Sequence, residues 1–238
     1  MKILKSILCL SMLAPALLVA GEAEITSSFK KIMPSLQISS IDKSEIKDLF
    51  TVETEGGEVL FTSSNGDFFI TGDMYSTQGG KLQNLTENRR GARRAEKVAS
   101  IKPDQKITFP AIGETKARIA VFTDIDCGYC RKLHNEVPAM NKMGIEVSYL
   151  AYPRAGVGSD SYQKFVSAWC ADDKLKAMTS AKNGQSIEAK TCENPVASQF
   201  ELGQKLGVTG TPAILLEDGR LIPGYMPADK LAANLGIL

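Results

Sequence analysis

The chain has 238 residues, with 28 basic and 27 acidic side chains and a hydrophobic content of 43%. This length suffices for one large or two small domains, and the hydrophobic content is that of an ordinary globular protein. The balanced charge gives no indication of a nucleic-acid partner, which a strongly basic chain would suggest.

The first residues have the pattern of a secretory signal peptide. Lys2 and Lys5 give a basic start, residues 7–19 are apolar, and small residues follow at positions 20, 21 and 23. The apolar stretch is too short to cross a bilayer, and small residues behind it are typical of a cleavage site. We predict a signal peptide over residues 1–21, with cleavage between 20 and 23, and therefore export.

The cysteines divide between this signal and the exported chain. Cys9 lies inside the signal, and the residues before it lack the small residue of a lipoprotein processing site. No later stretch is long and apolar enough for a transmembrane helix, so we expect no membrane anchor. The four remaining cysteines enter an oxidising compartment, which permits disulfides. They form two natural pairs, Cys127 with Cys130 and Cys170 with Cys192.

Residues 24–85 predict a small α+β domain. A helix is expected over 25–33, closed by Pro34. Asn65-Gly66 is a strong hairpin signal. Strands are expected at 49–54, 59–62 and 67–71. A unit of this size with no cysteine and no metal motif is marginal alone, so it either packs on a second domain or pairs with a copy of itself.

A basic run connects this domain to the rest of the chain. Residues 85–100 contain few apolar side chains and five basic ones: Arg89, Arg90, Arg93, Arg94 and Lys97. The run predicts a solvated linker helix, and we place the linker at 86–104. A nucleic-acid or membrane role is the alternative reading of such a charge run.

The second domain, residues 105–238, begins with a strand–helix–strand unit. A buried strand is expected at 118–123 and another at 145–150. Between them Leu133, Val137 and Met140 fall on one helical face. A unit of this length implies a parallel strand pair with a right-handed crossover.

The remaining chain completes an α/β pattern. A helix over 161–181 is followed by a second one that begins at Asn194-Pro195. Residues 213–216 and 221–222 form a hairpin around Asp218-Gly219, and a last helix follows Pro227. The order is therefore βαβ, a helical insertion, a β-hairpin and a helix.

The motif Cys127-Gly128-Tyr129-Cys130 lies where the first strand of this domain gives way to its helix. Unpaired backbone N–H groups and the positive end of the helix dipole favour a thiolate there. Cys130 lies three residues before Leu133, on the inward face. We expect Cys127 to be exposed and nucleophilic, and Cys130 to be shielded and resolving.

The alternative reading of a Cys-x-x-Cys motif is half of a zinc site. Zinc takes four ligands, commonly as two close pairs. Cys170 and Cys192 are far apart and form no second close pair, and the single histidine, His134, could supply a third ligand at most. We interpret His134 as a helix-surface residue and expect neither a metal nor another cofactor.

This order of elements, with the Cys-x-x-Cys motif at the start of a helix and Thr211-Pro212 before a late strand, resembles the thioredoxin fold. A more specific resemblance, over nearly the whole exported chain, is to the DsbC-type periplasmic disulfide isomerases. Its marks are the segments 121–130, 132–134, 149–154, 168–171, 207–213 and 223–225, with Met74-Tyr75 after the N-terminal sheet.

The resemblance implies a periplasmic homodimer joined through the N-terminal domains. Its partners would be exported proteins with wrong disulfides and a membrane reductant of the DsbD type. It implies that Cys170–Cys192 is structural and that the bond between Thr211 and Pro212 is cis, facing the reactive cysteines. Gly128 and Tyr129, between those cysteines, complete the expected site.

One departure from thioredoxin itself stands out. Thioredoxins carry a buried acid six residues before the first active-site cysteine, and here that position is Val121. The nearest acids, Asp124 and Asp126, cannot be assigned as a proton relay from sequence.

The expected reaction is attack of a Cys127 thiolate on a substrate disulfide. Another substrate thiol then resolves the mixed disulfide, which gives isomerisation, or Cys130 does, which gives net reduction. Two alternatives remain open on the same fold. One is a dithiol oxidase, and the other is a holdase chaperone that grips unfolded chains through apolar surface.

Overall fold

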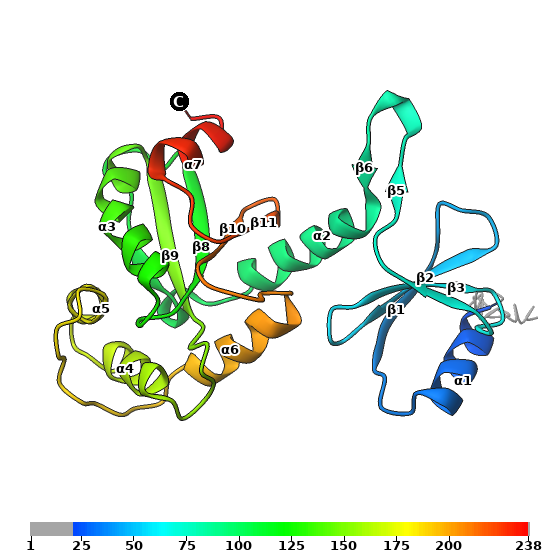
Figure 1. Ribbon diagram of the computed structural model, residues 1–238, viewed down its shortest axis with the longest axis horizontal. Coiled ribbons are helices and arrows are strands. Elements are labelled where there is room, and N and C mark those ends of the chain that lie inside the picture. Colours follow the sequence, from blue (N-terminus) through cyan, green and yellow to red (C-terminus); the bar gives the residue numbers. More distant parts are fainter. Residues whose placement is uncertain (1–20, 238) are drawn as a thin grey trace, which may run out of the picture. The chain divides into compact units, whose positions relative to one another are not determined.

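The computed structural model describes residues 21–237, so all but the last position of the predicted signal peptide lies outside the described residues. The described chain forms two compact units. The first contains the residues up to 54 together with 60–71, and the second contains 55–59 and everything from 72 onward (Figure 1).

The first unit is an antiparallel sheet with one helix. Its elements are α1 (Glu22–Ile32), β1 (Ile38–Lys43), β2 (Leu49–Thr54), β3 (Val59–Ser63) and β4 (Phe69–Thr71), and the strands lie in the order β1-β2-β3-β4. Ile25 and Phe29 of α1 pack with Phe50, Val52 and Leu60 of the sheet. The three predicted strands are confirmed, and β1, which is rich in polar residues, is a strand that the sequence did not predict.

The second unit contains a five-stranded mixed sheet, as a thioredoxin-like fold requires. Its strands are β7 (Ile107–Phe109), β8 (Ala117–Thr123), β9 (Ile145–Ala151), β10 (Ala213–Leu216) and β11 (Leu221–Pro223), in the order β11-β10-β8-β9-β7. Strands β8 and β9 are parallel and joined through α3 (Gly128–Lys142), which confirms the predicted crossover unit. The other pairs are antiparallel.

Successive side chains in the middle of β8 point to opposite faces of the sheet and are apolar, so both faces must be covered. Ile119 and Val121 join the larger core, which also contains apolar residues of α3 and of α7 (Ala228–Asn234). Ala120 and Phe122 point the other way and pack in a second core, which includes Phe200 of α6 (Val196–Lys205). Figure 1 shows α3 and α7 together beside β8 and β9.

The helix predicted over 161–181 is wrong as a single element. The structure has two helices there, α4 (Asp160–Trp169) and α5 (Lys174–Lys182). The Asp173 side chain accepts the Lys176 backbone N–H at 2.9 Å and thereby caps the start of α5. The break falls at Cys170, one of the two cysteines outside the Cys-x-x-Cys motif.

The linker helix α2 (Leu85–Ala99) begins after a short ribbon of β5 (Tyr75–Ser76) and β6 (Gln83–Asn84). The expectation of a solvated helix is wrong at Arg94, which is buried and donates from Nε to the Leu206 carbonyl at 3.0 Å. The helix also lies close to the β10–β11 hairpin, because a Cβ on Gly219 would collide with the backbone of Gly91. Among residues 21–237, no helix combines the length and apolarity needed to cross a membrane.

Candidate active site

Cys127 caps the N-terminus of α3. Its backbone is extended, with φ −84° and ψ 124°, and its sulfur accepts the Cys130 backbone N–H at 3.4 Å. The strand β8 ends at Thr123, so the turn after it delivers Cys127 to the helix start as the sequence predicted. The Cys130 N–H has no backbone acceptor in the helix, and its hydrogen bond to the Cys127 sulfur favours the thiolate.

The Cys127 side chain is buried, at 4% exposure, which corrects the expectation of an exposed thiol. Its sulfur lies 3.3 Å from the carbonyl oxygen of Thr211, which comes from the distant loop before β10. Burial raises the pKa of Cys127. Hydrogen bonds from the Cys130 backbone and thiol, the Thr211 side chain and the charge of Arg154 together outweigh burial and lower that pKa overall.

Cys130 has the opposite environment. Its side chain is fully buried, as predicted, and its sulfur accepts the Asp124 backbone N–H at 3.4 Å. Burial raises the pKa of the Cys130 thiol, although the charge of Lys182 opposes the shift. The two thiols are therefore chemically unequal: Cys127 ionises more readily, and Cys130 holds its proton more firmly.

The other expected site residues lie around this pair. The bond between Thr211 and Pro212 is cis, as the resemblance implied. Tyr129 is exposed at 65% and stacks on Tyr225, with ring centroids 6.4 Å apart. A Cβ at Gly128 would meet no atom within 4 Å, so packing does not demand glycine there.

The side chain of Asp124 is buried and accepts several hydrogen bonds instead of facing solvent. Its carboxylate accepts the Asp126 backbone N–H at 2.9 Å, two N–H groups of Arg154 at 3.0 Å each, and the Ser161 hydroxyl. Burial raises the pKa of Asp124, but these hydrogen bonds outweigh it and lower the pKa below the usual value. The carboxylate therefore stays charged and ties the turn before Cys127 to α4.

His134 is buried, at 5% exposure, so the interpretation as a helix-surface residue is wrong. Its Nδ1 lies 2.9 Å from the Tyr149 hydroxyl, and its Nε2 lies 3.2 Å from the Thr179 hydroxyl. Burial and, secondarily, the charge of Lys182 lower the pKa of His134 to about 4. The imidazole is neutral at physiological pH and fastens α3 to β9 and α5.

Lys182 is the site residue that sequence reasoning missed. It lies in the last turn of α5, is buried, and donates to the Thr123 hydroxyl and the Asp124 carbonyl. Its neighbours come from parts of the chain about 60 residues away, so no local pattern could indicate its burial. A lysine side chain is almost never fully buried unless its charge is paired, so the burial of Lys182 is unusual.

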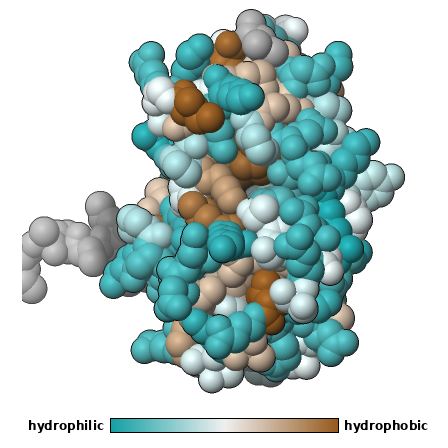
Figure 2. All heavy atoms as spheres, turned by 90° about the vertical axis from the view of Figure 1, so that its left-hand side faces the viewer, coloured by the Kyte–Doolittle hydropathy of each residue, from teal (hydrophilic) through white to brown (hydrophobic). Residues whose placement is uncertain are grey.

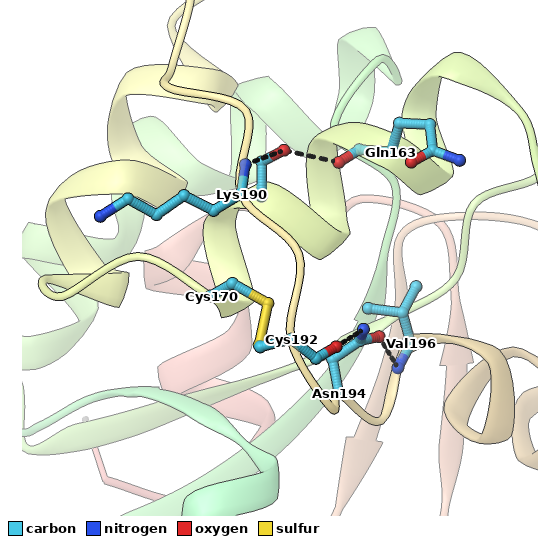
Figure 3. Close-up of a disulfide and its surroundings, with 7 residues drawn as sticks. Gln163, Cys170, Lys190, Cys192, Asn194 and Val196 are labelled. Carbon is cyan, nitrogen blue, oxygen red and sulfur yellow. Dashed lines mark hydrogen bonds between the residues drawn. A yellow bond between two sulfur atoms is a disulfide. The ribbon is translucent and has the colours of Figure 1, made fainter.

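Cys170 and Cys192 are joined by a disulfide, with Cα atoms 5.7 Å apart (Figure 3). It ties the end of α4 to the segment that leads into α6. Two further contacts fix that segment: the Lys190 backbone N–H reaches the Ser167 hydroxyl, and Asn194 accepts the Val196 backbone N–H at 3.2 Å. Within residues 21–237, histidine, cysteine and acidic side chains form no cluster that could hold a metal ion.

Comparison with known proteins gives two family matches. Residues 16–87 match the disulfide bond isomerase protein N-terminal domain, and residues 105–236 match a thioredoxin-like domain. Together these two models cover most of the chain, and each falls on one of the two domains that the sequence suggested.

Curated relatives agree with these matches. The thiol:disulfide interchange protein DsbC of Dickeya dadantii is 38% identical over 216 residues, which cover 91% of this chain and 87% of that protein. DsbC of Escherichia coli K12 is 36% identical over 212 residues, covering 89% and 86%. A solved disulfide interchange protein from Neisseria gonorrhoeae is 31% identical, with a TM-score of 0.51, over 57% of this chain and 96% of that one. Given the site described above and these similarities, the chain belongs to the DsbC family of thiol:disulfide interchange proteins.

Proposed function

We propose that this chain is a periplasmic disulfide isomerase and reductase that rearranges non-native disulfides in exported proteins. Cys127 is the nucleophile and Cys130 the resolving thiol. The observation that carries the proposal is the inequality of the two sulfurs: the Cys127 sulfur caps α3 and accepts a backbone N–H, whereas Cys130 is fully buried. In keeping with this geometry, the pKa of Cys127 is lowered and that of Cys130 is raised. A thiolate, not a thiol, attacks a disulfide, so this inequality assigns the two roles.

The reaction begins with attack of the Cys127 thiolate on one sulfur of a substrate disulfide. This step breaks the substrate S–S bond, forms a mixed disulfide and releases the other substrate sulfur as a thiolate. If a substrate thiol then attacks the mixed disulfide, Cys127 leaves as a thiolate and the substrate has a rearranged disulfide. If Cys130 attacks instead, the substrate leaves reduced and the protein becomes oxidised.

Thr211 and the residues around it are positioned to hold the substrate. The Thr211 carbonyl lies 3.3 Å from the Cys127 sulfur, so a chain that reaches this sulfur also reaches that carbonyl. A backbone N–H of the substrate then has an acceptor beside the reacting bond, in the manner of an added strand. Pro212, Gly128 and the exposed Tyr129 shape the approach.

The reduced state of this pair must be restored after each net reduction. A membrane dithiol reductant of the DsbD type is the partner proposed for this step. It would attack the Cys127–Cys130 disulfide and take up its two oxidising equivalents. The predicted signal peptide and membership of the family support a periplasmic location for this reaction.

Residues 24–85 are proposed as a dimerisation domain, 86–104 as the linker and 105–238 as the catalytic domain. Support comes from β4, an edge strand whose residues are all exposed, including the apolar Phe69 and Ile70. An exposed apolar edge is a template for pairing with another chain. Sedimentation of the full-length protein should show a dimer at micromolar concentration, and a monomer would contradict this assignment.

The proposed activity is tested by refolding a scrambled substrate that contains several disulfides. Wild-type protein should restore the native disulfides, Cys127→Ser should not, and Cys130→Ser should accumulate mixed disulfides while it keeps some isomerase activity. Alkylation at mildly acidic pH should label Cys127 before Cys130. Preferential labelling of Cys130 would reverse the assigned roles.

A further inference from the structure

Lys182 is a buried cation that the reaction described above does not use. Its side chain is 1% exposed, although it lies at the end of a helix that is partly open to solvent. Figure 2 shows the α3–α5 side of the second unit covered mostly by hydrophilic residues, which reach solvent. Burial of a charged group costs free energy unless its partners offset that cost. The contacts of the Lys182 ammonium group therefore indicate its role.

The partners of Lys182 are neutral oxygens. Its Nζ donates to the Thr123 Oγ1 at 2.6 Å and to the Asp124 carbonyl oxygen at 2.8 Å. The nearby Asp124 carboxylate instead receives hydrogen bonds from Arg154, Ser161 and the Asp126 backbone. Among the described residues, Lys182 therefore has no hydrogen-bonded carboxylate, and its positive charge is left to act on its other neighbours.

Both partners of Lys182 also act on Cys130. The Asp124 backbone N–H donates to the Cys130 sulfur at 3.4 Å, and the Thr123 hydroxyl lowers the pKa of Cys130. An ammonium group can only donate, so Thr123 must accept from Lys182 through its oxygen lone pair. The hydroxyl proton of Thr123 is then free to be donated to the Cys130 sulfur.

We propose that Lys182 is a positioning residue for the resolving step: it orients the Thr123 hydroxyl and the Asp124 backbone toward Cys130 and supplies the positive charge that stabilises the Cys130 thiolate. This inference rests on the proposed function, because it concerns the second step of that reaction. It makes Lys182 a determinant of how often a mixed disulfide ends in reduction rather than in isomerisation.

At the start of the resolving step, in the mixed disulfide, Cys130 is a thiol, and it loses its proton to solvent. The Cys130 thiolate attacks the Cys127 sulfur, the Cys127–Cys130 bond forms, and the bond between Cys127 and the substrate breaks. The substrate sulfur leaves as a thiolate and takes a proton from solvent. Over both steps the substrate disulfide gains two electrons and the cysteine pair loses them.

The charge state of Lys182 gives this role a pH signature. Burial lowers the pKa of Lys182 to about 8, although the negative charges of Cys130, Asp124 and Cys127 act to raise it. The titratable and charged groups that face it are Asp124 after β8, Cys127, Cys130, Arg131 and His134 on α3, and Tyr149 on β9. At neutral pH the lysine is charged, and above about pH 8 this charge is lost.

The experiment separates the two steps in the reduced, full-length protein. A bis(nitrobenzoate) disulfide releases one coloured thiolate when Cys127 attacks it and a second one when Cys130 resolves the mixed disulfide. Stopped-flow absorbance therefore gives a concentration-dependent first phase and a concentration-independent second phase. The variants are Lys182→Met, which keeps the length and removes the charge, and Lys176→Met, which removes an exposed lysine from the same helix.

At neutral pH we expect Lys182→Met to slow the second phase about three- to tenfold. For each unit by which the pKa of Cys130 rises, the fraction of thiolate falls about tenfold. The thiolate that remains is about threefold more nucleophilic, so the rate of the resolving step falls about threefold per unit. The first phase should change less, the difference between the proteins should shrink above about pH 8, and Lys176→Met should match wild type. If Lys182→Met does not fold, Lys182→Gln tests the same loss of charge.

The outcomes separate this inference from the proposed function. Equal second phases in wild type and Lys182→Met, with the same pH profile, would overturn the role of Lys182 and leave the proposed function intact. A constant difference at all pH values would also overturn it, because a purely structural effect has no reason to follow the lysine charge. Failure of wild type to release either thiolate would refute both.

Discussion

Acidification should destabilise the second unit through His134. Burial and the charge of Lys182 lower the pKa of this imidazole to about 4, against 6.5 for an unperturbed histidine. Both ring nitrogens already contact hydroxyl groups, those of Tyr149 and Thr179. A protonated ring would have to donate from both nitrogens in an interior that already holds a positive charge.

The sign and size of the effect follow from linkage. Above pH 6.5 the histidine is neutral in both the folded and unfolded states and has no influence on the pH dependence. Between pH 6.5 and about 4 the unfolded chain binds a proton that the folded chain does not, so the free energy of unfolding falls as the pH falls. The full difference corresponds to about 3 kcal/mol, a large part of the stability of a typical domain.

Denaturant unfolding at a series of pH values measures this effect. Trp169, the single tryptophan, is 2% exposed and reports on the second unit by fluorescence. His134→Gln is the matched variant because it removes the only histidine and keeps a neutral hydrogen-bonding side chain. The variant should be less stable at neutral pH, and its free energy of unfolding should fall less steeply between pH 6.5 and 4. Parallel curves, or an NMR titration of His134 near pH 6.5, would refute the reasoning.

Three further changes test other parts of the site. Replacing both Cys170 and Cys192 by Ala opens a loop with a sequence separation of 22, and thermal unfolding should show a loss of about 3 kcal/mol with Cys127 still reactive toward alkylating agents. Asp124→Asn removes a buried charge that accepts four hydrogen bonds, and denaturant unfolding at neutral pH should show a loss of about 2–3 kcal/mol; an unchanged midpoint would mean that the carboxylate is dispensable. Thr211→Val should raise the pKa of Cys127, measured by thiolate absorbance, because the Thr211 side chain contributes to lowering it. Stability should not fall, because the buried Thr211 hydroxyl has no hydrogen-bond partner in the described chain.

The sheet of the second unit could be predicted because its strands carry strong local signals. Residues 119–122 are apolar on both faces, as a strand covered on both sides must be, and the helix after them carries a clear apolar stripe. The strand β1 carries a weaker signal, since only its two isoleucines are apolar. The break after α4 was missed although Asp173, a good cap, was visible, because the flanking residues are all compatible with one helix.

The polar interior could not be predicted from sequence. His134 follows Leu133 on a helix whose apolar stripe is narrow, and its burial depends on Tyr149 and Thr179 from two other elements. Lys182 reads as an ordinary terminal lysine of a helix until its contacts with the end of β8 are known. A periodic pattern reports which face of a helix is apolar, whereas polar burial depends on partners that only the tertiary fold brings together.

The proton on Cys127 links ionisation of the thiol to binding of the substrate. As a thiol, Cys127 donates to the Thr211 carbonyl oxygen at 3.3 Å, and this contact occupies the acceptor proposed for the substrate backbone. As a thiolate, the sulfur has no proton to donate and keeps only the Cys130 backbone N–H that it already accepts. The carbonyl of Thr211 then lacks its donor in a partly buried position, and an N–H from the substrate would restore the lost hydrogen bond. The same deprotonation that makes Cys127 a nucleophile therefore frees the Thr211 carbonyl for the substrate strand beside it.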